Sequence, residues 1–253
     1  MSLLVISDIH GQRAAAEEAL RLGDAEGRRI ILLGDLVDRG PDSAGTLAMI
    51  LPRVLAGEIT WIRGNHDDKL GRALQGHNVQ TTHGLAETLN EIARFPKSSQ
   101  LKRDILLGLD RTHHWFRIGG YLFVHGAFVP DMLTWFDEQD APSRKAWSHA
   151  RSHALYGQTT GRKLPSGYPE RIYNWVDQVP ERLTVVVGHD VRDTGHPVTM
   201  TGNKGGRVIF LDTGAGKGGV LTAMRLDEET IEQFTCETRR TESSPIAQSR
   251  ETV

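Results

Sequence analysis

The chain repeats one local pattern, in which a short run of aliphatic or β-branched residues is followed at once by glycine, aspartate, asparagine or histidine. The runs are residues 3–6, 30–33, 59–62, 121–124 and 185–187. Runs of this kind are typical of buried strands. Polar residues at the carboxyl ends of successive strands lie where sheets of this class place ligands. The pattern therefore predicts an α/β chain with one site at the strand ends.

Each run is followed by a short polar signature, and two of the five signatures are specific. Gly-Asp-Leu-Val-Asp-Arg-Gly at 34–40 combines glycines with three charged side chains, and Gly-Asn-His-Asp at 64–67 has the same setting. The others are Asp-Ile-His at 8–10, Val-His-Gly at 124–126 and Gly-His-Asp at 188–190. Any one of these alone is more often a turn former or a helix cap. Five in register indicate a functional site.

The side-chain types suit a pair of divalent metal ions. Mn²⁺ and Fe²⁺ accept mixed carboxylate, imidazole and amide-oxygen ligands. Two such ions ~3.5–4 Å apart can clamp both oxygens of a phosphoryl displacement. Asp8 and His10 suit one ion, and Asp35 is the natural bridging carboxylate. The ligands that can complete the second ion are Asn65, His125 and His189. A hydroxide bridging the pair would then attack phosphorus in line.

Three neighbouring residues have complementary chemistry. His66 follows Asn65 on the same turn and is free to donate a proton to the leaving oxygen. Asp38 can pair with His66 and hold its ring in place. Arg39 offers a planar fork for phosphate oxygens. We predict that His66 and Asp38 form a catalytic acid pair and that Arg39 binds phosphate.

The other candidates are less distinctive. Asp212 follows a further apolar run and is either a partner of the metal ligands or a turn residue. Seven histidines lack the strand-end setting, so we expect surface or hydrogen-bonded structural roles for them. They are His77, His83, His113, His114, His149, His153 and His196.

Composition restricts the class of protein. The 253 residues are 38% hydrophobic and 25% charged, which favours one large globular domain. The net charge of -2 argues against a broad surface for binding nucleic acid. The single cysteine, Cys236, excludes a disulfide framework and a cysteine-rich metal site. No apolar run approaches the ~20 residues of a bilayer span, and the first residues lack a signal-peptide pattern. We expect a cytoplasmic protein with one domain over 1–235 and a polar, flexible tail over 236–253.

Spacing and composition also predict the order of the elements. The first three signatures are about 30 residues apart, as in strand–helix–strand units. Residues 14–20 are rich in helix formers. Ser43 is expected to cap the next helix, which Pro52 kinks or ends. We predict that residues 67–118 are mainly helical and that 141–183 are rich in loops. Later strands are predicted at 184–188, 207–212, 219–226 and 230–235.

Together the signatures resemble those of the calcineurin-like metallophosphoesterases, and the 34–40 signature is similar to their phosphoprotein phosphatase branch. The resemblance extends from Leu3 to about Leu226. It implies an α/β fold of the α+β-type, four-layer kind, with a central β-sandwich flanked by helices. It also implies two divalent metal ions, Mn²⁺ foremost, with Fe, Zn, Ni or Co as alternatives. The residues that match its metal ligands are Asp8, His10, Asp35, Asn65, His125 and His189.

Further stretches resemble bacterial subgroups of this family, which include bacterial serine/threonine protein phosphatases. Residues 211–214 and 218–226 are similar to symmetric diadenosine tetraphosphatases. Other stretches resemble the phosphatase module of bacterial polynucleotide kinase–phosphatases, which acts on RNA 2′,3′-cyclic phosphates and on phosphomonoesters. They are residues 65–70, 82–89 and 154–161, running on to 174–175. In that module the residue that matches Asp212 belongs to the active site.

The resemblance implies a phosphoesterase for phosphomonoesters and for 2′,3′-cyclic phosphodiesters of nucleotides or RNA ends. A serine/threonine or tyrosine protein phosphatase is the nearest alternative. A symmetric diadenosine tetraphosphatase is disfavoured because that subgroup lacks the acid that Asp38 provides. An inactive scaffold is disfavoured because the ligand set is complete.

The expected partner is a phosphorylated small molecule, a nucleotide or RNA end, or a phosphoprotein, with no membrane contact. The chain has no Gly-x-x-x-x-Gly-Lys-Ser/Thr sequence and no ligase-like segment, so we expect no kinase or ligase domain in it. A second phosphate-binding arginine is expected from residues 141–183. The candidates are Arg144, Arg162 and Arg171.

Overall fold

The computed structural model describes residues 2–165 and 167–238, in which the apolar runs are strands buried on both faces. Strand β1 (Leu3–Ile6) shows why these runs are continuous. Leu3 and Val5 contribute to a core between two sheets, whereas Leu4 and Ile6 contribute to a second core beneath helices. Successive side chains of a strand point to opposite faces, so a strand between two layers needs apolar residues throughout.

The first sheet has the strand order β12-β11-β1-β2-β3. Its centre is parallel, because β1 pairs in parallel with β2 and β2 with β3. Strands β11 and β12 extend it in antiparallel fashion. The added strands are β2 (Arg29–Leu32), β3 (Ile59–Trp61), β11 (Leu221–Arg225) and β12 (Thr230–Phe234).

The second sheet has the order β4-β5-β8-β10-β9. Strands β5, β8 and β10 are parallel, and the edge strands β4 and β9 are antiparallel to their neighbours. The strands are β4 (Trp115–Ile118), β5 (Tyr121–Val124), β8 (Thr184–Val187), β9 (Val198–Thr201) and β10 (Arg207–Phe210). The two sheets pack face to face over the central apolar core.

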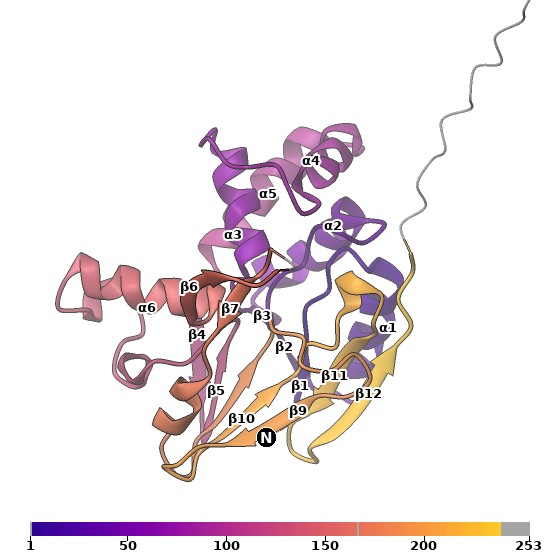
Figure 1. The fold of residues 1–253 in the computed structure, drawn as a ribbon. Coiled ribbons are helices and arrows are strands. Elements are labelled where there is room, and N and C mark those ends of the chain that lie inside the picture. Colours follow the sequence, from indigo (N-terminus) through magenta and orange to yellow (C-terminus); the bar gives the residue numbers. More distant parts are fainter. Residues whose placement is uncertain (1, 166, 239–253) are drawn as a thin grey trace, which may run out of the picture.

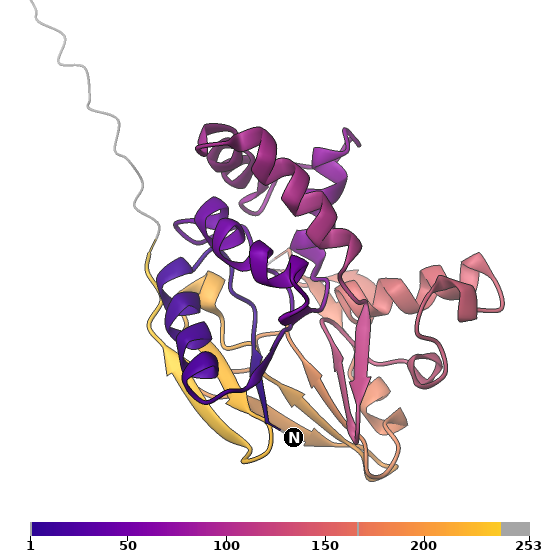
Figure 2. The ribbon, with the colours of Figure 1, turned by 180° about the vertical axis from the view of Figure 1, so that it is seen from behind.

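Helices cover both outer faces of this sandwich, as Figures 1 and 2 show. Helices α1 and α2 lie on the first sheet, α4 and α5 pack against α2, and α3 packs against α4 and α5. Helix α6 contributes to the core on the second sheet. The helices are α1 (Arg13–Ala25), α2 (Ser43–Leu55), α3 (Asn65–Leu74), α4 (Leu85–Arg94), α5 (Ser98–Asp110) and α6 (Arg144–Tyr156). The expected α/β fold, a central β-sandwich flanked by helices, is confirmed.

Two local expectations were wrong. Helix α2 is capped by Asp42, whose carboxylate accepts the amide of Gly45, and Ser43 is its first residue. The segment 67–118 is mainly helical as predicted and ends in strand β4, but 141–183 is not mainly loop. The latter holds α6, the hairpin β6 (Thr159–Lys163) and β7 (Pro169–Arg171), and the 3-10 turn η3 (Asn174–Gln178). The remaining 3-10 turns are η1 (Pro130–Leu133), η2 (Glu138–Asp140) and η4 (Ala215–Lys217).

The division of the chain into one domain over 1–235 and a tail over 236–253 stays a prediction. Residues 239–253 lie outside the described residues. The described start of the expected tail is anchored, because the amide of Glu237 donates to Gln12 Oε1 at 2.8 Å.

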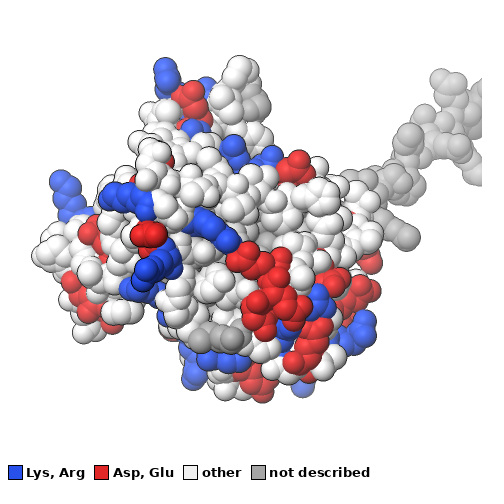
Figure 3. Space-filling model, turned by 90° about the horizontal axis from the view of Figure 1, so that it is seen from below, with Lys and Arg blue, Asp and Glu red and all other residues white. Residues whose placement is uncertain are grey.

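The surface and the helices bear on the expected partners. The face drawn in Figure 3 carries both acidic and basic groups, in keeping with the small net charge. Within the described part of the chain, no helix combines the length and apolar character needed to span a membrane.

Candidate functional site

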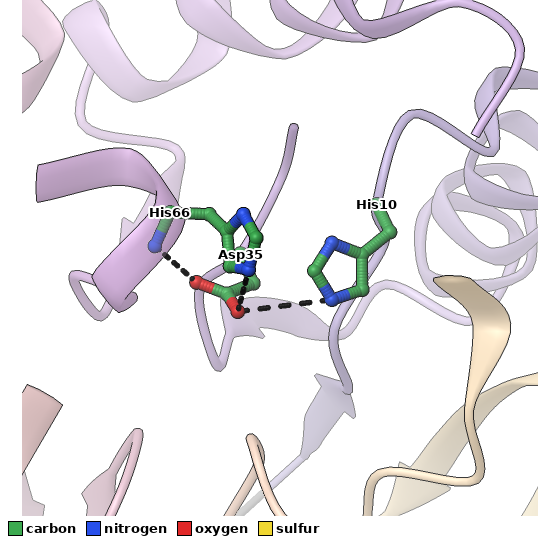
Figure 4. Close-up of side chains that lie close together, drawn as sticks. All are labelled: His10, Asp35 and His66. Atoms are coloured by element: carbon green, nitrogen blue, oxygen red, sulfur yellow. Dashed lines mark hydrogen bonds and ion pairs between the residues drawn. The ribbon is translucent and has the colours of Figure 1, made fainter. Parts of the chain in front are cut away.

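The polar signatures converge where strands from both sheets end. Among the described residues, two groups of candidate metal ligands have ligand atoms within 4.8 Å of one another, and both groups contain Asp35. One group is His10, Asp35 and His66, and the other is Asp35, His125 and His189. Figure 4 shows the Asp35 carboxylate between the rings of His10 and His66. Asp35 is therefore shared by both groups, and its role as the bridging ligand of a metal pair stays a prediction.

The backbone reaches this arrangement through an unusual conformation. His10, Asp35 and His189 have φ values of 48°, 48° and 63°, in the left-handed region that residues with a Cβ atom rarely adopt. Gly34 (φ 100°) approaches the next turn so closely that a Cβ atom there would lie 2.5 Å from the backbone nitrogen of Gly64. Such conformations cost about 1–3 kcal/mol each and persist where the surroundings enforce them. Here they turn the side chains toward one another.

Two histidines each direct an unprotonated nitrogen toward an arginine. His10 Nδ1 donates to the carbonyl of Val37 at 2.9 Å, and its Nε2 accepts from Arg39 at 2.7 Å. His189 Nε2 accepts from Arg171 at 2.7 Å. Burial, reinforced by Arg39 for His10 and by His125 for His189, holds both pKa values well below the usual range. Neutral imidazoles of this kind are the form that binds metal ions.

His125 lies in an environment that favours a cation. Its Nδ1 donates to the carbonyl of Leu33 at 2.8 Å, and its Nε2 lies 3.4 Å from Asp35 Oδ1 and 3.2 Å from Asn65 Oδ1. Burial opposes a charge on the ring, but Asp35 and Asp8 outweigh it and raise the pKa of His125 to about 10. A cation among these oxygens is thus stabilised, whether it is a proton or a metal ion. The residues present fit a metal pair.

Buried carboxylates surround the site. Burial raises the pKa of Asp8 well above its usual range, and neighbouring Asp212 adds to the effect. Burial also raises the pKa of Asp212. For Asp35 burial acts in the same direction, but His125, His66 and His10 outweigh it and hold the pKa well below the usual range. Divalent cations would relieve the repulsion among these acids.

Asp8 and Asp212 lie beside the two ligand groups. Both Asp8 oxygens accept the amide of His189, at 3.0 and 3.1 Å. Asp8 is absent from both groups of candidate metal ligands found among the described residues, although it is buried and its carboxylate accepts from His189. Asp212 accepts the amide of Gly214 at 2.9 Å, as a turn residue does, and is also an electrostatic neighbour of Asp8. Asp212 is therefore a turn residue and also a neighbour of a predicted metal ligand, so both roles considered for it remain open.

His66 is held by a buried hydrogen-bond chain. Its Nδ1 donates to Asp38 Oδ2 at 2.5 Å, and Asp38 Oδ1 accepts from Thr88 at 2.6 Å. The Asp38 amide donates to Ser43 Oγ at 2.9 Å, so both ends of this aspartate are fixed. His66 Nε2 faces Asp35 Oδ2 at 4.0 Å. The expected pairing of His66 with Asp38 is present, whereas its catalytic role stays a prediction.

Two arginines flank the centre of a cavity of about 500 Å³. Arg39 contacts His10 and His66, and its NH2 group lies 3.0 Å from His66 Nε2. Arg171 lies on the opposite ligand group, beside His189. Arg162 instead has a side chain 78% exposed and paired with Glu170 at 3.0 Å.

The other candidate, Arg144, is 91% exposed and lies near Glu138. Among the three arginines expected from residues 141–183, Arg171 lines the cavity, whereas Arg144 and Arg162 are not among its described lining residues.

Asp67 is a residue to which the sequence interpretation gave no role. Its carboxylate accepts the amides of Asp35 (2.8 Å), Leu36 (2.9 Å) and Gly64 (3.0 Å), and the indole N–H of Trp61 (3.2 Å). Burial and the charge of Asp35 raise its pKa to about 6. Asp67 thus ties two of the signature loops together. Its position at the third residue of α3, where acids commonly cap a helix, was the available signal.

Other residues of the cavity also escaped the sequence interpretation. His83, for which a structural or surface role was expected, lines the cavity. Tyr156, Tyr168 and Lys217 line it as well, from the end of α6, the hairpin turn and η4. None follows an apolar strand run, so the pattern that marked the other candidates could not mark them.

Comparison with known proteins agrees with the fold. A family model described as calcineurin-like phosphoesterase matches residues 1–193. The asymmetrical bis(5'-nucleosyl)-tetraphosphatase PrpE of Geobacillus thermodenitrificans (strain NG80-2) is 29% identical over 244 residues, which cover 91% of this chain and 92% of the relative. PrpE of Anoxybacillus flavithermus (strain DSM 21510 / WK1) is 30% identical over 210 residues, with 81% and 78% covered.

Solved structures show the same fold at lower sequence identity. A protein serine/threonine phosphatase from Saccharomyces cerevisiae, with similarity to human phosphatase PP5, has a TM-score of 0.59 at 17% identity, covering 95% of this chain and 81% of that one. A metallophosphoesterase from Sphaerobacter thermophilus has a TM-score of 0.50 at 21% identity, with 94% and 89% covered.

These findings define the class of protein first. The metallophosphoesterase fold and the similarity to phosphate-hydrolysing relatives make this chain a hydrolase of phosphate esters. It belongs to the calcineurin-like phosphoesterase family, whose model matches most of its length. Members of that family use a dinuclear divalent metal centre, and the two ligand groups around Asp35 could hold such a pair.

Proposed function

We propose that this protein hydrolyses phosphate esters and anhydrides of nucleotides with two divalent metal ions, Mn²⁺ foremost. The observation that carries the proposal is the position of His66. Its ring is fixed through Asp38 and directs Nε2 toward the carboxylate that both ligand groups share. A ring held in this way is suited to move a proton beside the metal pair.

The metal ligands divide between two ions in this proposal. Asp8 and His10 would hold one ion, Asn65, His125 and His189 would hold the other, and Asp35 would be shared by both. Bound ions would polarise the phosphoryl oxygens and lower the pKa of a water molecule. The left-handed turns and the backbone carbonyls that hold His10 and His125 fix these ligands before any ion binds.

The chain's own residues bind and protonate the substrate. Arg39 and Arg171 approach the centre from two sides and donate to phosphate oxygens. His66 gives a proton from Nε2 to the leaving oxygen while Nδ1 stays on Asp38. Asp38 stabilises the cationic ring and Thr88 keeps the carboxylate in place.

Nucleotide substrates are favoured by the relatives and by the charge of the cavity. The bis(5'-nucleosyl)-tetraphosphatases match the chain along nearly its whole length. The described lining of the cavity contains Arg39, Arg171 and Lys217, with Asp35 as its carboxylate. Such a cavity suits a substrate with several negative charges. Phosphomonoesters and 2′,3′-cyclic ends of nucleotides satisfy the same chemistry.

The test is kcat/KM of the Mn²⁺-loaded protein on a substrate panel. The panel holds a dinucleoside tetraphosphate, a nucleoside monophosphate, an RNA 2′,3′-cyclic end and a phosphopeptide, with Asp8→Asn as the blank. The proposal expects the highest value for one of the nucleotide substrates. A preference for the phosphopeptide would identify a protein phosphatase instead, and no turnover of any substrate would reject the proposal altogether.

A further inference from the structure

Beyond the predicted metal centre, the cavity has a rim with an aromatic residue that the fold does not need. Tyr168 lies at the turn between β6 and β7 and is 55% exposed. Strand β6 is exposed along its whole length, so this ribbon does not contribute to a core. Tyr168 nevertheless lines the cavity. An exposed ring that faces a binding cavity is better explained by recognition than by folding.

Lys217 stands beside this ring. Its Nζ lies 5.6 Å from the centroid of Tyr168, within the range of a cation–π contact. Among the described residues Lys217 has no carboxylate at ion-pair distance, and the same is true of Arg39. Asp212 is an electrostatic neighbour of Lys217, but no ion pair among the described residues holds the ammonium group, so it can also contact an anionic ligand in the cavity.

The loop of Lys217 is also packed onto the predicted metal centre. Gly216 lies so close to the His10 ring that a Cβ atom there would be 2.6 Å from His10 Cδ2. Tyr168 and Lys217 thus line the same cavity as Asp35, and the loop of Lys217 packs against His10. A ligand whose phosphate reacts beside Asp35 would place its next phosphates near Lys217 and a ring against Tyr168.

We infer that Tyr168 and Lys217 form a nucleoside polyphosphate subsite, in which the base stacks on Tyr168 and Lys217 binds the phosphates beside the reacting one. The inference rests on the proposed function, because it names the part of the substrate that the site selects. A cavity of about 500 Å³ is in the range that holds one small molecule.

Inhibition measurements separate the base from the phosphates. With p-nitrophenyl phosphate as the reporter substrate of the Mn²⁺-loaded protein, the inhibition constants of ADP and of inorganic pyrophosphate are measured for wild type, Tyr168→Ala, Tyr168→Phe and Lys217→Ala. Lys163→Ala is the control on the same hairpin, because Lys163 is exposed and is not among the described lining residues.

If the base stacks on Tyr168, Tyr168→Ala should raise the inhibition constant of ADP by about 5- to 100-fold, the usual contribution of one stacked base. The inhibition constant of pyrophosphate should stay within about 2-fold of the wild-type value. Tyr168→Phe keeps the ring and should match the wild type. Lys217→Ala should weaken both inhibitors. Equal losses for ADP and pyrophosphate in Tyr168→Ala, or no loss for ADP, would overturn the inference.

A separate binding measurement distinguishes this inference from the proposed function. Calorimetric titration of ADP into wild type and Tyr168→Ala needs no turnover. If the wild type fails to hydrolyse nucleotides but binds ADP through Tyr168, the proposed substrate is wrong and the subsite stands. If nucleotides are hydrolysed equally well by wild type and Tyr168→Ala, and ADP binds both equally, the function stands and the subsite is rejected.

Discussion

Asp35 is the residue on which both ligand groups depend, because its two oxygens face different histidines. Oδ2 lies 3.7 Å from His10 Nε2, and Oδ1 lies 3.4 Å from His125 Nε2. The amide of His66 also donates to Oδ1 at 2.9 Å. One carboxylate therefore positions groups from three separate turns.

Asp35→Asn should remove metal binding and activity together, because the bridge loses its charge. Changing a residue that only supports a metal ligand lowers metal affinity or activity by about 10–100-fold, so changing a bridging ligand should lower them at least as much. Metal content by mass spectrometry and kcat/KM on p-nitrophenyl phosphate check this. Asp24→Asn, an exposed change at the end of α1, is the control. Retention of both ions in Asp35→Asn would show that another group bridges them.

His66→Ala should retain the metal ions and slow turnover by roughly 10²–10⁴-fold, the usual contribution of a positioned acid. The loss should be smaller for p-nitrophenyl phosphate than for an alkyl phosphate, since a good leaving group needs little protonation. Metal content matters here because His66 also lies within ligand distance of Asp35 and His10. A variant that loses an ion would identify His66 as a ligand rather than the acid.

At this scale the sequence indicates chemistry only where a residue follows a strand. Asp35, His66 and Asp38 could be named because their signatures combine glycines and charges after an apolar run. Asp67 and Tyr168 could not. The role of Asp67 depends on backbone amides that lie near it only in the folded chain. The role of Tyr168 depends on a hairpin that reaches the cavity from another part of the chain.

The β6–β7 hairpin is the element that separates the candidate arginines. Arg171 points toward His189, whereas Arg162 faces solvent and Glu170. Arg171→Ala should lower kcat/KM by about 10–100-fold, because it removes charge-assisted hydrogen bonds worth roughly 1.5–3 kcal/mol. Arg162→Ala, on the same hairpin, should stay within about 2-fold. Steady-state kinetics decide between them, and the reverse order would move the second phosphate site to Arg162.

The end of α1 is tied to the first sheet by a charge cluster with a defined pH dependence. Glu26 accepts from Arg225 at 2.7 Å and from Arg28 at 2.6 Å, and these bonds lower its pKa to about 2. A carboxylate with a depressed pKa stabilises the fold above its ordinary value of 4.5, and this contribution is lost as the pH falls toward about 2.

The Tm difference between wild type and Glu26→Gln should therefore be largest above about pH 5 and shrink between pH 4.5 and about 2. Thermal unfolding followed by circular dichroism over this range measures it. Glu17→Gln, exposed on the same helix, is the control. A difference that does not change with pH would mean that packing, and not the charge of Glu26, connects the helix to the sheet.

Elements were predictable where their apolar pattern is strong. The buried strands have continuous aliphatic runs because two layers cover them. Helix α6 was missed because its buried face is weak. Trp147 and the alanines at 150 and 154 have helical spacing, but alanines give little apolar contrast among the charged and histidine residues around them. Proline and glycine at its two ends add to the appearance of a loop.

At the scale of the whole molecule, the two sheets meet so that acids from several strand ends are buried together. Asp8, Asp35, Asp67 and Asp212 are each at most 3% exposed, and the burial of Asp8 and Asp212 raises their pKa values. The sequence could place these acids at strand ends, but their mutual distances depend on how the second sheet packs on the first. A divalent cation bound at this point would reduce the repulsion among these carboxylates.

Divalent metal should consequently raise the thermal stability of the whole protein. An ion that binds the folded state at 100 times its Kd contributes about 2.7 kcal/mol, which corresponds to a Tm increase of roughly 5–10 °C for a domain of this size. Differential scanning calorimetry with MnCl₂ and with EDTA measures the shift. Asp35→Asn should lose most of it, whereas Asp24→Asn should keep it. An equal shift in Asp35→Asn would place the stabilising ion away from the strand ends and would contradict the assignment of this site.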